Sequence, residues 1–316
     1  MLSQAAPEAT PSSEEVRVSS DLLVVTNAAA GTTSHETVRA ARDVWDEAHR
    51  PYDVVETSGR EELDEVLGRR GDRVVVVVGG DGSLHAVAAA LERRGELGSA
   101  VVGLVPLGTG NDLARGAGIP LDPHEAARVV LTGAPSPLDV LEDSAGGIVV
   151  NAVNAGIGAS ASERAAPWKA RLGPLGYVVG AVAAGIREGG WYLRVEVDGE
   201  VVVDGSLRVL HLVIGNGPTV GGGAEAAPGA RLSDGAADVV VSLATGPLAR
   251  LGYAARLRRG EHTGRRDVVT ARGRRFIVSG EPFPWNVDGE IGRPRRDATW
   301  TVRPAAWRLL LPAGPE

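Results

Sequence analysis

The stretch VVVVVGGDGSLHAV, which runs from Val74 to Val87, decides the fold class of this sequence. Its five consecutive valines are apolar on both faces, which is typical of a central strand in a parallel sheet. Two glycines, Asp81, a glycine and a serine follow, and helix-forming residues begin at Leu84. Ligands of parallel α/β sheets bind beyond the carboxyl ends of the strands. The order of strand, glycine loop and helix therefore predicts an α/β unit with a lone carboxylate at its ligand-binding edge.

Strands and helices alternate around this stretch, from about residue 21 to residue 132. Capping boxes beginning at Thr33 and Ser58 predict two helix starts. The Asp122-Pro123 pair predicts a third, with proline at the first helical position. A further helix is expected over residues 84–94, and the short apolar strands are LLVVTN, DVVET, RVVVVV and VVGLV. This alternation predicts a doubly wound α/β domain.

The sequence after about residue 137 consists of short, β-rich segments separated by glycines. Asp198-Gly199 lies between two Val-rich segments and predicts a β-hairpin with a type I′ turn. Helices are expected at about 175–187 and 247–258. These features predict a second domain that is mainly antiparallel β structure.

The chain is therefore expected to divide into four parts. These are a disordered tail, an α/β domain, a β-rich domain and a closing strand that returns to the first domain. The tail is predicted from its Ser, Pro, Ala and Glu content. In that order, the expected bounds are 1–20, 21–137, 138–299 and 300–316.

The composition argues against several classes of protein. The net charge of −7 argues against broad nucleic-acid binding. The absence of cysteine excludes disulfides, thiolate metal sites and cysteine nucleophiles. Lys169, the only lysine, lies outside any Gly-Lys-Ser/Thr sequence, which excludes a P-loop. No apolar run approaches the roughly 20 residues that span a bilayer, and the N-terminus lacks the apolar region of a signal peptide, so we expect a cytoplasmic protein.

Two of the predicted strands end in glycine-rich loops, GGDGS at residues 79–83 and PLGTGND at residues 106–112. Glycines let a phosphate approach the backbone, whose N–H groups can then donate to it. Asp81 would repel a phosphate directly, but a Mg²⁺ ion between them turns the repulsion into a bridge. The two loops therefore predict a polyphosphate cradle. The alternative is a tight turn in which Asp81 caps the next helix, and the dinucleotide pattern G-x-G-x-x-G fits less well because its third glycine is absent.

The combination of GGDGS with PLGTGNDLARGAGIP resembles the catalytic domain of the diacylglycerol kinase family of lipid kinases. Phosphofructokinases and NAD kinases carry loops similar to GGDGS, but the combination with PLGTGND and the late VDGE is specific. The resemblance extends from about residue 22 to residue 312. Further matching elements are Asn27 with Gly31, NAGIG at 154–158, GNG at 215–217, GGG at 221–223, APGARLSDG at 227–235 and PAAWRLLLP at 304–312.

The resemblance implies a phosphofructokinase- and NAD-kinase-like α/β domain followed by an antiparallel β-sandwich, with ATP in the cleft between them. It implies phosphate transfer from ATP, with Mg²⁺, to a lipid hydroxyl such as that of diacylglycerol. Asn111 and Asp112 are expected to fix the second loop, and an N-cap role for Asp112 stays open as an alternative. The expected nucleotide-binding residues are Asn27, Thr57, Gly79, Gly80, Asp81, Gly82, Ser83, Gly108, Thr109, Asn111 and Asp112.

The late VDGE motif supplies the expected proton acceptors for the lipid hydroxyl, Glu290 first and Asp288 second. Residues two apart in an extended segment point to one face, so both carboxylates are expected to face the cleft. A surface turn is the alternative explanation of the Asp-Gly pair. The resemblance also implies a structural Mg²⁺ site in the second domain, whose ligands are the side chain of Asp234 and the carbonyl oxygens of Arg231 and Ala236.

The sequence departs from the family pattern at two places. Ala28 stands where the family usually has proline, which should loosen a turn. After GGDGS the family commonly has Asn-Glu, and this chain has His85 and Ala86. The missing carboxylate puts a salt bridge or metal contact at this position in doubt. His85 is expected either to contact a phosphate or to lie on the helix surface.

A lipid substrate has to be reached from a membrane surface, and two basic groups could meet anionic headgroups there. Solvated surface arginine is the alternative. We expect peripheral, reversible contact with the inner face of the membrane, while the identity of the lipid and the choice between monomer and homodimer stay open. The two groups are Arg256, Arg258, Arg259, Arg265 and Arg266, and Arg164, Lys169 and Arg171 near Trp168.

Two other functions compete with a lipid kinase. One is a kinase of a soluble substrate such as NAD, and PLGTGND together with the β-rich domain argues against it. The other is a nucleotide- or lipid-binding regulator with weak catalysis, which Ala86 supports. The four retained carboxylates argue against that regulator; they are Asp81, Asp112, Asp288 and Glu290.

Overall fold

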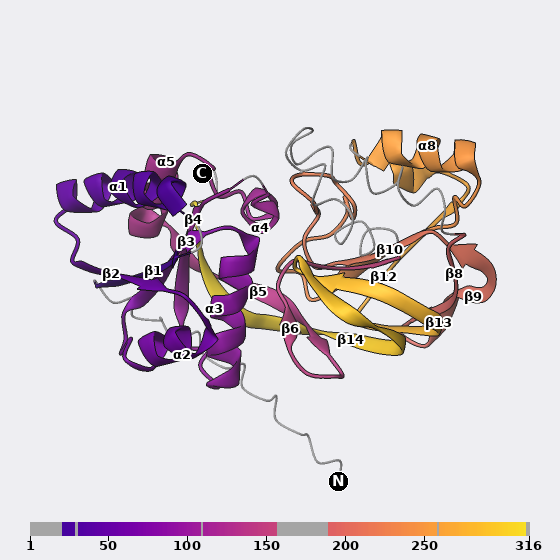
Figure 1. Ribbon diagram of the computed structural model, residues 1–316, viewed down its shortest axis with the longest axis horizontal. Coiled ribbons are helices and arrows are strands. Elements are labelled where there is room, and N and C mark those ends of the chain that lie inside the picture. Colours follow the sequence, from indigo (N-terminus) through magenta and orange to yellow (C-terminus); the bar gives the residue numbers. More distant parts are fainter. Residues whose placement is uncertain (1–20, 29–30, 109, 157–188, 258, 314–316) are drawn as a thin grey trace, which may run out of the picture.

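The structure is a computed structural model that describes residues 21–28, 31–108, 110–156, 189–257 and 259–313, with the side chains of 31–34 left out. The expected tail at 1–20, the expected helix at 175–187 and the basic group around Trp168 lie outside these residues. Two lobes lie side by side and are joined by continuous strands (Figure 1).

The first lobe is built around a parallel sheet in which the strand order is β2-β1-β3-β4. Every residue of β3 and β4 is buried, which agrees with a central position. The four strands are β1 (Leu22–Asn27), β2 (Tyr52–Thr57), β3 (Val74–Gly79) and β4 (Val101–Pro106).

Helices cover both faces of this sheet. The two helices α1 and α5 pack together on one face, while α2 and α3 pack together on the other (Figure 1). This arrangement confirms the predicted doubly wound α/β domain. The helices are α1 (Gly31–Glu47), α2 (Arg60–Gly68), α3 (Asp81–Arg93), the short α4 (Asp112–Gly116) and α5 (Pro123–Thr132).

Three predicted helix starts are wrong by a few residues, and one is right. Helix α1 begins at Gly31, so Thr33 already lies inside it. Helix α2 begins after Gly59, and the N–H and hydroxyl of Ser58 donate to Glu62 instead of closing a box with Glu61. Helix α3 begins at Asp81 and not at 84, because the glycine loop itself winds into the first turn. Asp122 caps α5 through two backbone N–H groups, as predicted.

The second lobe is antiparallel and encloses its own core of aliphatic and aromatic side chains. The Asp198-Gly199 hairpin is present between β8 and β9, with positive φ at both turn residues. Helix α8 (Pro247–Leu257) and the short 3₁₀ helix η3 (Glu261–Gly264) lie beside the strands. The strands are β6 (Ile148–Val149), β7 (Ala152–Gly156), β8 (Trp191–Val197), β9 (Glu200–Val209), β10 (His211–Gly215), β11 (Ala237–Ser242) and β12 (Val268–Gly273).

Two long strands, β5 (Ala134–Asp143) and β14 (Glu290–Leu311), connect the lobes, and a third, β13 (Arg275–Val287), pairs with β14 inside the second lobe. β13 pairs with β7 at one end and with β8 at the other. Register shifts in its pairing with β14 allow it to bend between these two ends. β14 starts against β13 and ends parallel to β4, so it runs from the second lobe into the sheet of the first (Figure 1). β5 pairs along β14. The two lobes are therefore held by shared sheet hydrogen bonds. Across the described ranges, no helix is long and apolar enough to cross a membrane.

Candidate functional site

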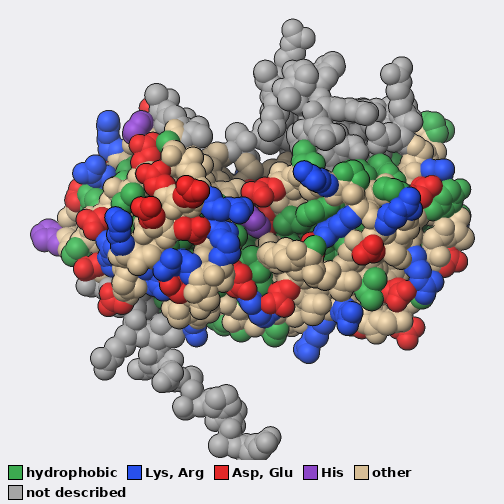
Figure 2. Space-filling model, turned by 60° about the horizontal axis from the view of Figure 1, so that its bottom comes forward, with side chains coloured by type: hydrophobic (Ala, Val, Ile, Leu, Met, Phe, Trp, Pro, Cys, Tyr) green, Lys and Arg blue, Asp and Glu red, His purple; other side chains and the backbone are tan. Residues whose placement is uncertain are grey.

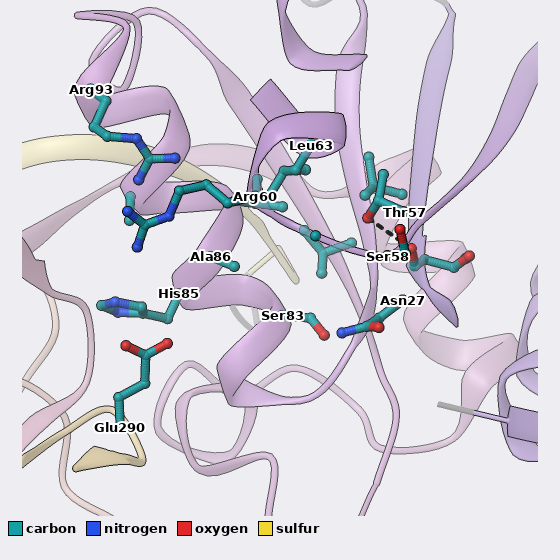
Figure 3. A pocket seen from close by; sticks show the side chains of 16 residues that line it. Asn27, Thr57, Ser58, Arg60, Leu63, Ser83, His85, Ala86, Arg93 and Glu290 are labelled. Carbon is teal, nitrogen blue, oxygen red and sulfur yellow. Dashed lines mark hydrogen bonds between the residues drawn. The ribbon is translucent and has the colours of Figure 1, made fainter. Parts of the chain in front are cut away.

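A pocket of about 240 Å³ lies at the carboxyl ends of β1 and β2, between α2 and α3. Polar side chains from β1, β2 and α3 face it beside aliphatic side chains, and Glu290 reaches it from the second lobe (Figure 3). The lining residues that carry polar side chains are Thr26, Asn27, Thr57, Ser58, Arg60, Ser83, His85, Arg93 and Glu290. The pocket therefore lies where a ligand of an α/β sheet is expected.

The glycines beside this pocket differ in why they are needed. A Cβ on Gly79 would lie 2.5 Å from the Cβ of Ser83, so the turn from β3 into α3 requires glycine. A Cβ on Gly80 would meet the carbonyl oxygen of Leu107 at 3.0 Å, because the two glycine loops touch each other. Gly82 is different, since a Cβ there would meet nothing within 4 Å. Glycine in a helix costs up to about 1 kcal/mol relative to alanine, so open space at Gly82 is consistent with a ligand that approaches the backbone.

Asp81 ties the two glycine loops together. Its carboxylate accepts hydrogen bonds from the N–H groups of Asp112 (3.0 Å) and Leu113 (3.1 Å) at the start of α4. The alternative that Asp81 caps its own helix is wrong, because Gly80 is the N-cap of α3 and no side chain caps it. Burial raises the pKa of Asp81; its two hydrogen bonds oppose the rise, while the charges of Asp112 and Asp288 add to it.

Asp112 joins the second loop to the second lobe. Its carboxylate accepts hydrogen bonds from the N–H groups of Gly222 (3.0 Å) and Gly223 (2.7 Å), and its carbonyl accepts one from the hydroxyl of Thr219 (2.9 Å). The N-cap alternative for Asp112 is wrong, because Asn111 precedes α4 and Asp112 is the first helical residue. The GGG segment at 221–223 is thus bound to the first lobe by a carboxylate.

Asn111 holds the second loop in a left-handed conformation, with φ of 52°. Its amide N–H donates to the carbonyl of Gly108 at 3.1 Å. Its side-chain oxygen is buried and has no hydrogen-bond partner among the residues that the structure describes. A buried acceptor without a donor is costly, and a donor group of a bound ligand or water would relieve this cost. Thr109, expected to bind nucleotide, lies outside the described residues.

Asp288 does not lie in an extended segment, which corrects the basis of the same-face prediction. Asp288 and Gly289 form a two-residue turn between β13 and β14, with φ of 47° and 95°. The Asp288 side chain is 0% exposed. It accepts backbone hydrogen bonds from Val150 (2.8 Å), Asn151 (2.9 Å) and Ala152 (3.0 Å). Three N–H donors hold this side chain in place between the β13–β14 turn and residues 150–152.

His85 and Glu290 complete the end of the pocket nearest the second lobe. His85 follows Asp81 by one helical turn, and its side chain is only 12% exposed. Its Nδ1 lies 2.7 Å from Oδ2 of Asp288. The alternative that His85 lies on the helix surface is therefore wrong. The exposed side chain of Glu290 points toward the imidazole (Figure 3).

Comparison with known proteins supplies the family. Residues 21–142 match the Diacylglycerol kinase catalytic domain, and residues 151–311 match the YegS C-terminal NAD kinase beta sandwich-like domain. A protein of Pseudomonas aeruginosa described as "Probable lipid kinase YegS-like" is 34% identical over 300 residues, which cover 93% of this chain and 94% of that protein. The chain belongs to the YegS-like lipid kinase family. The expected β-sandwich of the second lobe is confirmed with it.

Other relatives support the same assignment. A "Probable lipid kinase YegS-like" of Stenotrophomonas maltophilia is 34% identical over 77% of this chain and 80% of its own length. A "Diacylglycerol kinase" of Staphylococcus carnosus is 27% identical over 69% of this chain and 70% of its own length. A crystal structure of a diacylglycerol kinase from Bacillus anthracis matches with a TM-score of 0.73 at 20% identity, and the match covers 93% of this chain and 97% of that one. This last likeness shows a shared fold.

The structural Mg²⁺ site implied for this YegS-like kinase is arranged differently from the expectation. The carboxylate of Asp234 forms an ion pair with Arg272 and accepts the N–H of Ala236 at 3.3 Å. Arg231 is exposed. The guanidinium of Arg272 thus occupies the only carboxylate among the three expected ligands. In this arrangement the expected ligands do not fit a Mg²⁺ ion.

A catalytic Mg²⁺ fits the first lobe better. Within the described ranges no three His, Cys, Asp or Glu side chains form a ready metal cage. Mg²⁺ in phosphate-transfer sites needs only one or two carboxylates, since phosphates and water complete its shell. The carboxylate of Asp81 has about four acceptor positions and two of them are in use. Its crowding by Asp112 and Asp288 also favours a cation there.

Some of the remaining expected residues of the YegS-like kinase line the pocket, and others lie on the surface of the second lobe. Asn27, Thr57 and Ser83 line the pocket, and the Thr57 hydroxyl donates to the carbonyl of Thr26 at 3.2 Å. Arg265 is not available to a membrane, because it is paired with Asp267. Arg258 lies outside the described residues, whereas three exposed arginines of that group are Arg256, Arg259 and Arg266.

Two cationic side chains of the pocket, Arg60 and Arg93, were not predicted from the sequence. Arg60 opens α2 and extends over the pocket, and Arg93 is held beside it by Asp64 at 2.9 Å (Figure 3). His85 was noticed without its partner Asp288. Its four-residue spacing from Asp81 places both on one face of a helix, and that spacing was the available signal.

Proposed function

We propose that this chain is an ATP-dependent lipid kinase that transfers the γ-phosphate to the hydroxyl of a diacylglycerol-like lipid. The observation that carries the proposal is the pocket between α2 and α3. It lies beside two glycine loops joined by Asp81, and the second lobe reaches its end through Glu290. Membership of a lipid kinase family supports the class of acceptor.

The first lobe would hold the nucleotide. The adenosine part would lie in the pocket against Asn27 and Thr57, and the phosphates would follow Ser83 and the open backbone at Gly82. The cationic side chain of Arg60 would attract them, in place of the lysine that a P-loop supplies. Mg²⁺ bound through Asp81 would neutralise phosphate charge and so favour attack at phosphorus.

The acceptor hydroxyl would enter at the end of the pocket formed by Glu290 and His85. Of the two carboxylates in the VDGE motif, Glu290 is exposed and lines the pocket. Asp288 is fully buried and has donors on both oxygens, so it cannot reach a substrate. Its contribution is to hold the turn and His85 in place.

The lipid would be reached by peripheral contact with the inner face of a membrane. Leu248 and Leu251 project from α8 with 85% and 58% of their surface exposed. Arg256 lies in the last turn of the same helix, and Arg259 follows two residues after its end. Leucine beside arginine suits an anionic interface, where apolar burial and charge attraction add. On the face shown in Figure 2, charges of both signs mix over the first lobe, while hydrophobic side chains gather over the second.

The test is a transfer assay with γ-labelled ATP, Mg²⁺ and a panel of lipid extracts and soluble acceptors. We expect label in the organic phase. Label only in the aqueous acceptor would indicate a kinase of a soluble substrate, and binding of ATP without any transfer would indicate a regulator. Both results would overturn the proposal.

The control variant for this assay is Asp81→Asn. Asp81→Ala would leave two N–H groups at the start of α4 without an acceptor, whereas asparagine keeps one side-chain oxygen for them. We expect Asp81→Asn to stay folded and to lose transfer. Near-normal transfer by this variant would contradict the role of Asp81.

A further inference from the structure

An aspartate–histidine pair joins the two lobes at the acceptor end of the pocket. His85 comes from α3 in the first lobe, and Asp288 comes from the β13–β14 turn in the second. Their side chains lie 2.7 Å apart, Nδ1 to Oδ2, and both are shielded from solvent, with 12% and 0% exposed. The pair is thus a fixed contact between lobes and not a surface encounter.

Asp288 determines which nitrogen of His85 carries a proton. The carboxylate accepts three backbone N–H groups, from Val150, Asn151 and Ala152, so both of its oxygens act as acceptors. The neighbouring Nδ1 must therefore donate. In the neutral ring this leaves Nε2 as an acceptor with a free lone pair.

The imidazole of His85 lines the pocket. His85 and Glu290 both line it, and Figure 3 shows the imidazole and the carboxylate facing each other there. Ala86 follows His85, so the next side chain of α3 fills little of this space. A hydroxyl entering between them would meet Nε2 on one side and a carboxylate on the other.

We propose that His85 is the general base that accepts the proton of the lipid hydroxyl through Nε2, oriented by Asp288 and supported by the charge of Glu290. This deepens the proposed function and rests on it. The O–H bond of the acceptor breaks as its oxygen bonds to the γ-phosphorus of ATP. The bond from that phosphorus to the bridging oxygen breaks with its electron pair leaving on ADP, and His85 later releases the proton to water.

The surroundings of His85 suit the role of a general base. A base works best when its pKa lies near the working pH. Burial alone lowers the pKa of His85, but the hydrogen bond to Asp288 and the charges of Asp288 and Glu290 outweigh it and raise the pKa above 6.5. The same two carboxylates would stabilise the imidazolium after proton transfer, in the manner of the Asp of a Ser-His-Asp triad.

Other charged groups border the site and enter its pH dependence. Asp81 lies one turn earlier on α3, and Arg93 lies two turns later. Arg60 reaches the pocket from α2. The two arginines oppose protonation of His85, and the carboxylates of Asp81, Asp288 and Glu290 favour it.

The kinetic test compares His85→Ala with His124→Ala, an exposed histidine on α5 as matched control. We expect His85→Ala to lower kcat about 100-fold with little change in KM for ATP, and added imidazole to restore part of it. In the wild type kcat/KM should fall on the acid side of the His85 pKa, and this limb should be absent in His85→Ala. The proposal is overturned if His85→Ala has the kcat of the wild type. It is also overturned if kcat falls in His85→Ala but imidazole restores none of it and the acid limb of the pH profile is still present.

A second measurement does not depend on turnover. The C–H resonances of His85, assigned by their absence from the His85→Ala spectrum, are followed by NMR against pH in the protein without nucleotide. We expect a midpoint above 6.5 that falls in Glu290→Gln. A midpoint below 6.5 that is unchanged in Glu290→Gln refutes the proposed effect of Asp288 and Glu290 on His85. If the wild type phosphorylates no lipid, the proposed function fails together with the general base. If the wild type phosphorylates lipid and His85→Ala does so at the same rate, only the general base is overturned.

Discussion

Gly82 offers a prediction in which stability and function change in opposite directions. It is the second residue of α3, and a Cβ there would meet no atom within 4 Å. Alanine is better than glycine in a helix by up to about 1 kcal/mol, and since Gly82 lies in the first turn we expect Gly82→Ala to raise the free energy of unfolding by about 0.5 kcal/mol. The methyl group would occupy the space proposed for a phosphate. Losing one backbone contact of about 1.4 kcal/mol weakens ATP binding about tenfold.

Gly79→Ala is the matched control in the same loop. Its Cβ would lie 2.5 Å from the Cβ and 2.7 Å from the Oγ of Ser83. Overpacking of this kind costs about 1–3 kcal/mol, so this variant should be less stable than the wild type. Urea denaturation gives the stabilities, and calorimetric titration with a non-hydrolysable ATP analogue and Mg²⁺ gives the affinities. The account is refuted if Gly82→Ala is destabilised like Gly79→Ala, or if it is stable and binds the analogue as well as the wild type.

Three further predictions concern the nucleotide, the membrane and pH. Arg60→Ala should raise KM for ATP several-fold in steady-state assays while kcat changes little, because the guanidinium contributes to binding and not to bond breaking; a fall in kcat alone would contradict this. The double variant Leu248→Ser with Leu251→Ser should lose at least about tenfold in binding to anionic vesicles by sedimentation, since two exposed leucines no longer enter the interface, and unchanged binding would place the membrane contact elsewhere. Because the pKa of Asp81 is raised from 3.8 by burial, the folded state retains its proton to higher pH than the unfolded state. The free energy of unfolding should therefore fall as pH rises from 3.8 through the folded pKa. Asp81→Asn should remove that decline in urea denaturation series, and an identical slope in the variant would argue against it.

The strands and loops of the first lobe could be predicted because their signals are local. The valines of β3 and the glycines after it determine a buried strand and a tight turn within a few residues. The helix starts were less predictable. The loop from Asp81 to Ser83 contains a glycine, which disfavours helix, yet it is the first turn of α3 because tertiary contacts hold it there.

The two Asp-Gly pairs carry the same turn signal, which was the first prediction at one site and the alternative at the other. Asp198-Gly199 was predicted to form a hairpin turn and does. Asp288-Gly289 has nearly the same backbone conformation, with φ of 47° and 95° against 50° and 91°. An extended segment was the first prediction there and a surface turn the alternative, and the turn is what the structure has. A type I′ turn needs positive φ at both central residues, which Asp-Gly supplies equally at both sites.

The partners of the buried carboxylates could not be predicted from the sequence. Asp112 accepts N–H groups from Gly222 and Gly223, and Asp288 accepts one from Val150, more than a hundred residues away in each case. Backbone donors carry no side-chain identity, so no residue type marks them. The contact between His85 and Asp288 arises in the same way, from two lobes joined by β14.

The most direct test of the lipid kinase assignment is ³¹P NMR of the purified protein with ATP, Mg²⁺ and mixed micelles that contain diacylglycerol. We expect a lipid phosphomonoester resonance that grows in step with ADP in the wild type. The resonance should be absent with Asp81→Asn at equal folded concentration. Release of inorganic phosphate with ADP, and no lipid phosphomonoester with any hydroxyl lipid supplied, would contradict it.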